Sequence, residues 1–335
     1  MTTDARTDKP AEQSSGFAWT QERIVFALAV ILFVVSAATL KGFLAPDNLI
    51  AIVRSVSVLG ILALGMAVLI IGRGIDLSMV AIMAMSAAWY LQMLGNGLPD
   101  WQALLYTLGF VLGIGLVNGF LVAYAEVPAI FATLASGSFV FGFVRSQLIT
   151  QDAVPVPKGH WLETIGRARF LDIPAEVYIF AGSAFALFLF LRFTKWGRYV
   201  YYMGDNPAAA RNVGIPVRPM ILLRHVISAL IALAAGLLTA SSLLSINTRV
   251  VNSTLLYDII LVVVIGGIGL SGGKGGVRNV IVGALLIGIM LNAMTILDIP
   301  NIYQNLIKST ILLAAIIVDS LLNPRDEQTS QQGDI

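Results

Sequence analysis

Few residues in this chain are of the types that catalyse reactions or bind metals. The sequence has two histidines, His160 and His225, and no cysteine, which excludes disulfides, cysteine-ligated metals and thiol catalysis. The nearest approach to a phosphate-binding loop is the run 272–276, Gly-Gly-Lys-Gly-Gly. Such a loop needs glycine six positions before its lysine and Ser or Thr after it, where this chain has Ile268 and Gly275. Nucleotide hydrolysis would therefore need another polypeptide.

The polar run 204–216 has the residue types that start and end a short helix. Asn206 can cap the helix by accepting from a backbone N–H, Pro207 suits the first helical position, and Gly214 can take the left-handed conformation. A helix of about two turns is marginal in water unless something packs on it, so we expect a soluble partner here. The residues of this docking loop are Gly204, Asn206, Pro207, Ala208, Ala209, Arg211, Gly214 and Ile215.

Two glycine-rich segments, residues 72–78 and 266–276, interrupt apolar runs. Broken helices often mark a transport route through a membrane, but tight loops at the cytoplasmic face would give the same pattern. Asp76 lies beside the start of an apolar run, where an unpaired carboxylate is costly. It can cap the following helix, pair with Arg73 or line a pathway, and the sequence leaves these three roles open.

Other polar residues lie on otherwise apolar helices. Asn118, Thr133 and Asn292 can line a path or form a hydrogen bond to a neighbouring helix, and both roles stay open. The candidates for a translocation pathway are Asp76, Ser78, Asn118, Thr133, Gly266, Gly267 and Asn292.

The composition places these residues in a polytopic membrane protein. Of the 335 residues, 57% are hydrophobic and only 12% are charged, and the mean hydropathy is +0.85. We expect an all-α fold with about ten transmembrane helices in a single domain, residues 23–322, between disordered tails, residues 1–22 and 323–335. The apolar runs are residues 24–40, 50–71, 78–95, 101–123, 129–149, 178–193, 219–244, 258–270, 278–297 and 302–322.

The distribution of Lys and Arg predicts the orientation. Cytoplasmic loops keep positive charge, and most Lys and Arg fall on the side that an even number of helices shares with both termini. Both termini and residues 195–218 are then cytoplasmic, and residues 150–177 form a long outer loop. His160 and His225 fall on opposite sides, so they cannot share a metal site, and we expect each to be an interfacial polar residue. The cations expected to anchor helix ends at the outer interface are Arg54, Arg145 and Lys308.

Over residues 43–320 the chain resembles the membrane permeases of bacterial ABC importers for ribose, xylose, arabinose and related monosaccharides. Four groups of residues in the right order carry the resemblance. They are Gly74-Ile75-Asp76-Leu77-Ser78, then Gly204, Asn206, Ala208-Ala209 and Gly214-Ile215, then Ile265-Gly266-Gly267, Leu270 and Gly272-Gly273-Lys274-Gly275, and finally Tyr303-Gln304, Lys308 and Asp319.

The resemblance implies a permease subunit in the bacterial inner membrane that performs no chemistry and binds no cofactor, metal or nucleic acid. Its partners would be a second permease, identical or different, a cytoplasmic ATPase that holds ATP and Mg²⁺, and a periplasmic binding protein that delivers the solute. The docking loop 204–215 would be the coupling helix that contacts the ATPase, whose closure switches the permease between outward and inward access.

The sequence departs from this family where it bears on the solute. Arg73 stands where the family usually has glycine, and Leu256 where it often has Glu. The sequence therefore does not identify which sugar is transported. A branched-chain amino acid, a nucleoside and a signalling molecule remain alternative solutes. An ion-coupled secondary transporter is a further alternative, but it should carry carboxylates in mid-membrane, whereas Asp258 and Asp298 fall near helix ends and Glu126 in a loop.

Overall fold

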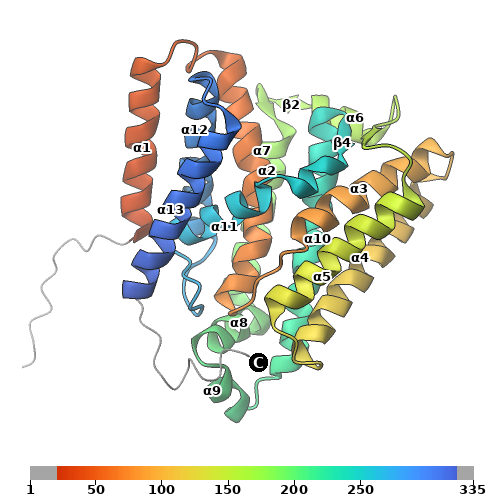
Figure 1. Cartoon of the computed structure of the whole chain (residues 1–335), viewed down its shortest axis with the longest axis vertical. Coiled ribbons are helices and arrows are strands. Elements are labelled where there is room, and N and C mark those ends of the chain that lie inside the picture. Colours follow the sequence, from red (N-terminus) through yellow and green to blue (C-terminus); the bar gives the residue numbers. More distant parts are fainter. Residues whose placement is uncertain (1–20, 323–335) are drawn as a thin grey trace, which may run out of the picture.

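The computed structural model describes residues 21–322, which form a helical bundle (Figure 1). Eight helices in this range are long and apolar enough to cross a membrane, and two shorter apolar helices, α3 (Met79–Gly95) and α11 (Leu255–Ile265), accompany them. The predicted all-α fold with about ten spans is confirmed. The long helices are α1 (Gln21–Thr39), α2 (Pro46–Ile71), α4 (Asp100–Ala123), α5 (Ala129–Phe143, extended by the π-helical turn Val144–Leu148), α7 (Ala175–Phe193), α10 (Val217–Leu243), α12 (Val277–Ile296) and α13 (Asn301–Leu322).

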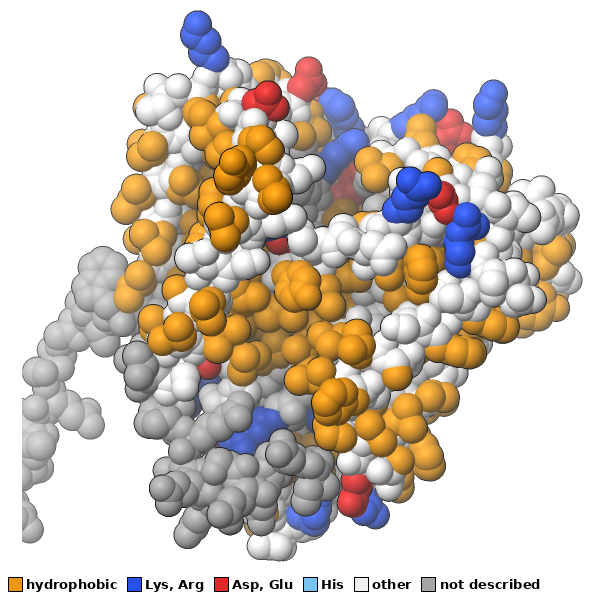
Figure 2. Space-filling view, in the orientation of Figure 1, with side chains coloured by type: hydrophobic (Ala, Val, Ile, Leu, Met, Phe, Trp, Pro, Cys, Tyr) orange, Lys and Arg blue, Asp and Glu red, His pale blue; other side chains and the backbone are white. Residues whose placement is uncertain are grey.

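Helix α2 runs through the centre of the bundle. Every residue from Leu59 to Ile71 is buried, and the helix packs against α7, α10, α11 and α12. A helix that is apolar on all sides is expected to be buried on all sides. The peripheral helices α1, α5 and α13 instead expose large apolar side chains, part of the hydrophobic surface in Figure 2, as lipid-facing helices do.

The break after α2 is a tight helix end. The N–H of Gly74 donates to the carbonyl of Leu69 (2.7 Å), and the N–H of Arg73 donates to that of Ile70 (2.9 Å). This pair of bonds is the Schellman motif, which needs a left-handed residue at the position of Arg73, where φ is 60°. A side chain costs roughly 1–2 kcal/mol in that conformation, so glycine is the usual residue.

Helix α11 ends by the same motif. The predicted apolar run continued to residue 270, but the helix stops at Ile265, because Gly267 (φ 101°) and Ile268 repeat the two hydrogen bonds seen after α2. The two glycine-rich segments are therefore alike in structure as well as in sequence. The end of α11 has glycine where the end of α2 has Arg73.

The connections gather at two opposite ends of the bundle (Figure 1). One end carries α6 (Trp161–Arg167), the antiparallel pair β1 (Ala153–Pro155) and β4 (Ser245–Asn247), the pair β2 (Arg169–Phe170) and β3 (Ile173–Pro174), and the 3₁₀ turn Thr248–Asn252. Val154 lies opposite Ile246 in the first pair. The other end carries α8 (Lys195–Asp205) and α9 (Pro207–Asn212). The predicted tails lie outside the described residues, except that Gln21 and Glu22 begin α1.

Candidate functional site

Helix α9 starts and stops as its sequence predicts. The Oδ1 atom of Asn206 accepts from the N–H of Ala209 (3.0 Å), and Pro207 is the first helical residue. Gly214 takes φ 82°, and the N–H of Ile215 returns to the carbonyl of Ala210 (3.0 Å). The side chains of Ala210 and Ile215 are buried and hold α9 against the protein.

The opposite face of α9 points away from the protein. Ala209 and Arg211 are exposed, and Val213, just after the helix, is 76% exposed. No described residue covers this face. Sequence reasoning missed Val213, although an apolar residue beside the glycine that ends a polar helix was a usable signal.

Helix α8 was not predicted, since residues 195–205 read as a polar segment. The Oγ1 atom of Thr194 caps it by accepting from the N–H of Gly197 (3.0 Å), and Val200 and Met203 are buried beneath it. A Cβ atom at Gly197 would collide with the carbonyl of Phe190, so the start of α8 packs closely against the end of α7. The cap and the apolar spacing were visible in the sequence.

The end of α8 is packed tightly against both glycine-rich segments. A Cβ atom at Gly204 would collide with the carbonyl oxygen of Ile71, and that oxygen accepts from the N–H of Gly273 (2.7 Å). The phenol of Tyr201 donates to the carbonyl of Gly275 (2.9 Å), and its burial raises the pKa of Tyr201, which keeps it a donor. Segments separated by about two hundred residues therefore meet at one junction.

The side chain of Arg73 occupies this junction. Its Nε atom donates to the carbonyls of Gly204 (2.6 Å) and Ser271 (2.8 Å), and an Nη atom donates to the carbonyl of Asp205 (2.6 Å). The guanidinium thus joins the end of α2, the end of α8 and residues 266–276.

Four of the predicted pathway residues form one buried cluster beside the junction. The Asp76 carboxylate accepts from the N–H of Ser78 (2.9 Å), from the Ser78 hydroxyl and from the Ser228 hydroxyl on α10 (3.0 Å). Asn118 on α4 donates to the Ser78 hydroxyl (2.9 Å), and Thr133 on α5 accepts from the N–H that follows Asp76 (3.0 Å). Three donors satisfy the carboxylate, which offsets the cost of burying it. Asp76 thereby fixes the start of α3 to the neighbouring helices.

The other three pathway candidates lie elsewhere. Asn292 on α12 exchanges two hydrogen bonds with Asn48 on α2 (2.8 and 3.1 Å), the interhelical role weighed for it. The carbonyl of Gly266 accepts from the side chain of Asn279 (2.7 Å), and Gly267 lies beside that same side chain. These residues join α11 and α2 to α12 and do not belong to the Asp76 cluster.

Two residues of α10 that sequence reasoning did not assign to this region complete it. Arg224 is buried and donates to the carbonyl of Gly72, where a cation offsets the negative end of the α2 dipole. His225 was expected at the interface, and this is wrong. It is 1% exposed, and its Nδ1 atom lies 2.9 Å from the carbonyl of Ile221. Arg224 and His225 are buried because α10 packs against α2 and α3, and the sequence alone does not show this packing.

The expectation that Lys308 anchors the membrane interface is also wrong. Lys308 is 6% exposed, and its ammonium lies 2.8 Å from Asp258 Oδ1 and 2.8 Å from Thr254 Oγ1. Lys308 lies on the side of α13 that packs against α11, so its ammonium is buried between these two helices and does not extend to a membrane interface. Arg54 and Arg145 also have partners, Glu176 (3.5 Å) and Asp152 (2.6 Å).

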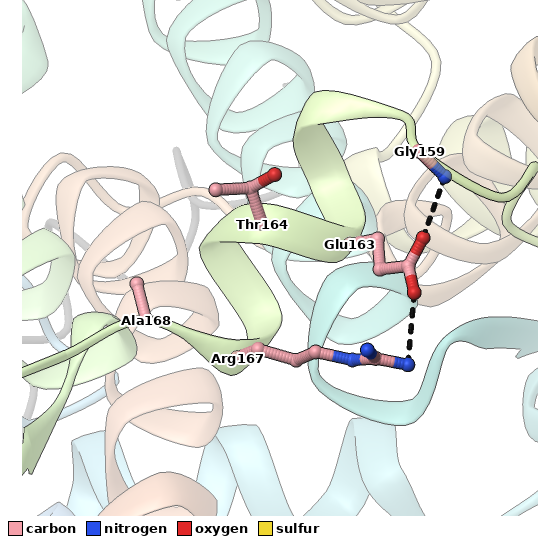
Figure 3. Close-up of a pocket in the computed structure, with 5 residues that line it drawn as sticks. All are labelled: Gly159, Glu163, Thr164, Arg167 and Ala168. Carbon is pink, nitrogen blue, oxygen red and sulfur yellow. Dashed lines mark hydrogen bonds and ion pairs between the residues drawn. The ribbon is translucent and has the colours of Figure 1, made fainter.

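The opposite end of the bundle carries a separate polar surface. Asp152 forms ion pairs with Arg249 (2.7 Å) and Arg145. The hydrogen bond from Arg249 has the largest effect, and the two arginines together hold the pKa of the Asp152 carboxyl below its usual range. A shallow pocket on α6 is lined by Glu163, which accepts from the Gly159 N–H (2.7 Å) and from Arg167 (2.8 Å) (Figure 3). Among residues 21–322 no group of three His, Asp or Glu side chains is placed to hold a metal ion.

Comparison with known proteins gives a consistent set of relatives. Residues 48–316 match the family described as branched-chain amino acid transport system / permease component. The ribose import permease protein RbsC of Haemophilus influenzae is 32% identical over 310 residues, 91% of this chain and 94% of that protein. RbsC of Bacillus subtilis is 31% identical over 298 residues (88% and 90%), and the galactofuranose transporter permease protein YtfT of Escherichia coli K12 is 32% identical over 271 residues (81% and 79%). No solved structure gives a significant match.

Proposed function

Because this chain belongs to the family described as branched-chain amino acid transport system / permease component, we propose that it is the membrane-spanning subunit of an ATP-driven importer. It moves a solute across the membrane by alternating between two conformations. The observation that carries this function is the outward face of α9, a capped helix at one end of the bundle that no described residue covers.

The transported solute is a monosaccharide. The names of the relatives support this class, since they include permeases for ribose and galactofuranose. The description of the family itself supports a second candidate, a branched-chain amino acid. A thermal-shift screen of the binding protein that co-purifies with the transporter decides between them: stabilisation by a pentose or hexose supports the first, and stabilisation by leucine alone contradicts it.

The subunit acts in an assembly. Its partners are a cytoplasmic ATPase that holds ATP and Mg²⁺, a periplasmic binding protein, and a second permease that is either a copy of this chain or a related one. The sequence supports a separate ATPase, because residues 272–276 do not have the pattern of a phosphate-binding loop. The loop rich in Lys and Arg that contains α8 and α9 supports a cytoplasmic position for that end, with both termini on the same side.

The docking of the ATPase on α9 is tested by a charge placed on its exposed face. Replacing Ala209 by Glu should weaken co-purification of the ATPase by roughly tenfold, since burying an unpaired charge at an interface typically costs more than 1 kcal/mol. The matched control is Thr164→Glu, which introduces the same residue at an exposed position of the short helix α6 at the opposite end. Unchanged ATPase recovery with Ala209→Glu would contradict the proposed docking surface.

A further inference from the structure

Arg73 holds a backbone conformation that suits glycine better. Its φ of 60° places it in the left-handed region at the end of α2, and the matching residue at the end of α11 is Gly267. A side chain at such a position is disfavoured unless its contacts compensate, so the contacts of Arg73 indicate what it does.

The contacts of Arg73 are directed at α8 and the second glycine-rich segment. The carbonyls of Gly204 and Asp205 lie at the C-terminal end of α8, where the helix dipole is negative and favours a cation. The planar guanidinium can donate to these carbonyls and to that of Ser271 together, which a lysine ammonium does less well. The side-chain stem passes over Gly272, where a Cβ atom would lie 2.6 Å from the Arg73 Cγ atom.

The same short connection is fixed on its other side by Asp76. Three residues after Arg73, that carboxylate binds Ser78 and Ser228, and Ser78 in turn binds Asn118. Residues 72–78 are thus hydrogen-bonded to α8 in one direction and to α4 and α10 in the other. A displacement of α8 that keeps these bonds must carry the start of α3 with it.

We propose that Arg73 is the positioning residue that transmits movement of α8 and α9 to the connection between α2 and α3 and to residues 266–276. The proposal rests on the proposed function in one respect, that the movement originates in a partner docked on α9. Arg73 itself needs no contact with that partner or with the solute.

The variant Arg73→Gly separates this role from a structural one, because glycine favours the observed φ while removing the guanidinium. In the transporter reconstituted with its ATPase and binding protein, we expect solute uptake per ATP hydrolysed to fall by roughly fivefold or more, the usual lower range of a coupling between sites. The unfolding temperature of the permease should stay the same or rise. Arg73→Lys should restore only part of the coupling, because one ammonium replaces the planar fork.

The control is Arg218→Gln, which removes an exposed arginine from the same end of the bundle, where it pairs with Glu126 (3.0 Å). Its uptake per ATP should stay within about twofold of the wild type, as expected for an exposed ion pair. Wild-type coupling in Arg73→Gly would overturn the proposal, and so would a loss of coupling that Arg218→Gln reproduces. If the ATPase fails to bind the wild-type chain, the proposed function itself is wrong, which is a different result.

A distance measurement tests transmission directly. The chain has no cysteine, so cysteines introduced at Val213, beside α9, and at Asn96, just after α3, can carry spin labels. In the assembled wild-type transporter, ATP should leave the distance between the labels nearly constant if α3 follows α9. In Arg73→Gly the distribution should shift or broaden, and an unchanged distribution would count against the proposal.

Discussion

At the scale of the residue, charges inside this protein are held by partners from other helices. Lys308 on α13 contacts Asp258 and Thr254 near the start of α11. Asp76 likewise accepts from Ser228 on α10, and Arg224 on α10 donates to the carbonyl of Gly72 at the end of α2. Uncompensated charge is costly in a membrane, so each of these contacts also fixes how two helices lie against one another.

Removing one charge of the buried Lys308–Asp258 pair should destabilise the protein more than removing both charges. We expect Lys308→Met to lower the free energy of unfolding by about 3–5 kcal/mol, because Asp258 is left as an unpaired buried carboxylate. The double variant Lys308→Met with Asp258→Leu should recover much of that loss. Denaturation in detergent measures both, with Lys41→Met, an exposed lysine at a loop, as the control. Equal stability of Lys308→Met and Lys41→Met would show that the pair carries no such energy.

At the scale of the element, helix ends decide where this chain can make its contacts. The ends of α2, α9 and α11 all use a left-handed residue and the same backbone hydrogen bonds. In α9 this ending and the Asn206 cap produce a helix too short to be stable alone, which the protein supports through the buried Ala210 and Ile215.

The cap of α9 gives a prediction for that element. Replacing Asn206 by Ala should cost about 1 kcal/mol of local stability, because the N–H of Ala209 loses its acceptor. Hydrogen exchange of the α9 amides should become correspondingly faster, while exchange in α2 stays the same. Asn206→Asp keeps a capping oxygen and should exchange like the wild type. If Asn206→Ala protects α9 as well as the wild type does, the cap does not stabilise the helix.

At the scale of the whole molecule, the two ends of the bundle are built differently. One end is covered by α6 and two short strand pairs, and the other presents α8 and α9 beside both glycine-rich segments (Figure 1). Among the described residues, the buried carboxylates of Asp76 and Asp258 have internal partners. Asp76 accepts hydrogen bonds from serines, and Asp258 pairs with Lys308. This arrangement favours transport driven through a docked partner over transport driven by an ion bound in mid-membrane.

We therefore predict that ATP, and not an ion gradient, drives uptake by the complete transporter. Uptake into proteoliposomes should require ATP enclosed on the side of α9 and should persist when an ionophore dissipates the ion gradients. Chelating Mg²⁺ on that side should stop it, since the nucleotide acts with the metal. Uptake that continues without ATP and collapses with the ionophore would instead establish an ion-coupled transporter.

The sequence by itself determined the approximate number of apolar, membrane-spanning helices and most of their limits, the cap and end of α9, and the likeness of the two glycine-rich segments. These follow from local signals, namely apolar run length, capping residues and glycine. Only the tertiary structure decided that Asp76, Ser78, Asn118 and Thr133 meet while Asn292 lies apart, that His225 and Lys308 are buried, and that Arg73 reaches α8. Such contacts join residues far apart in the chain, and helix packing sets them in ways that hydropathy and residue spacing do not encode.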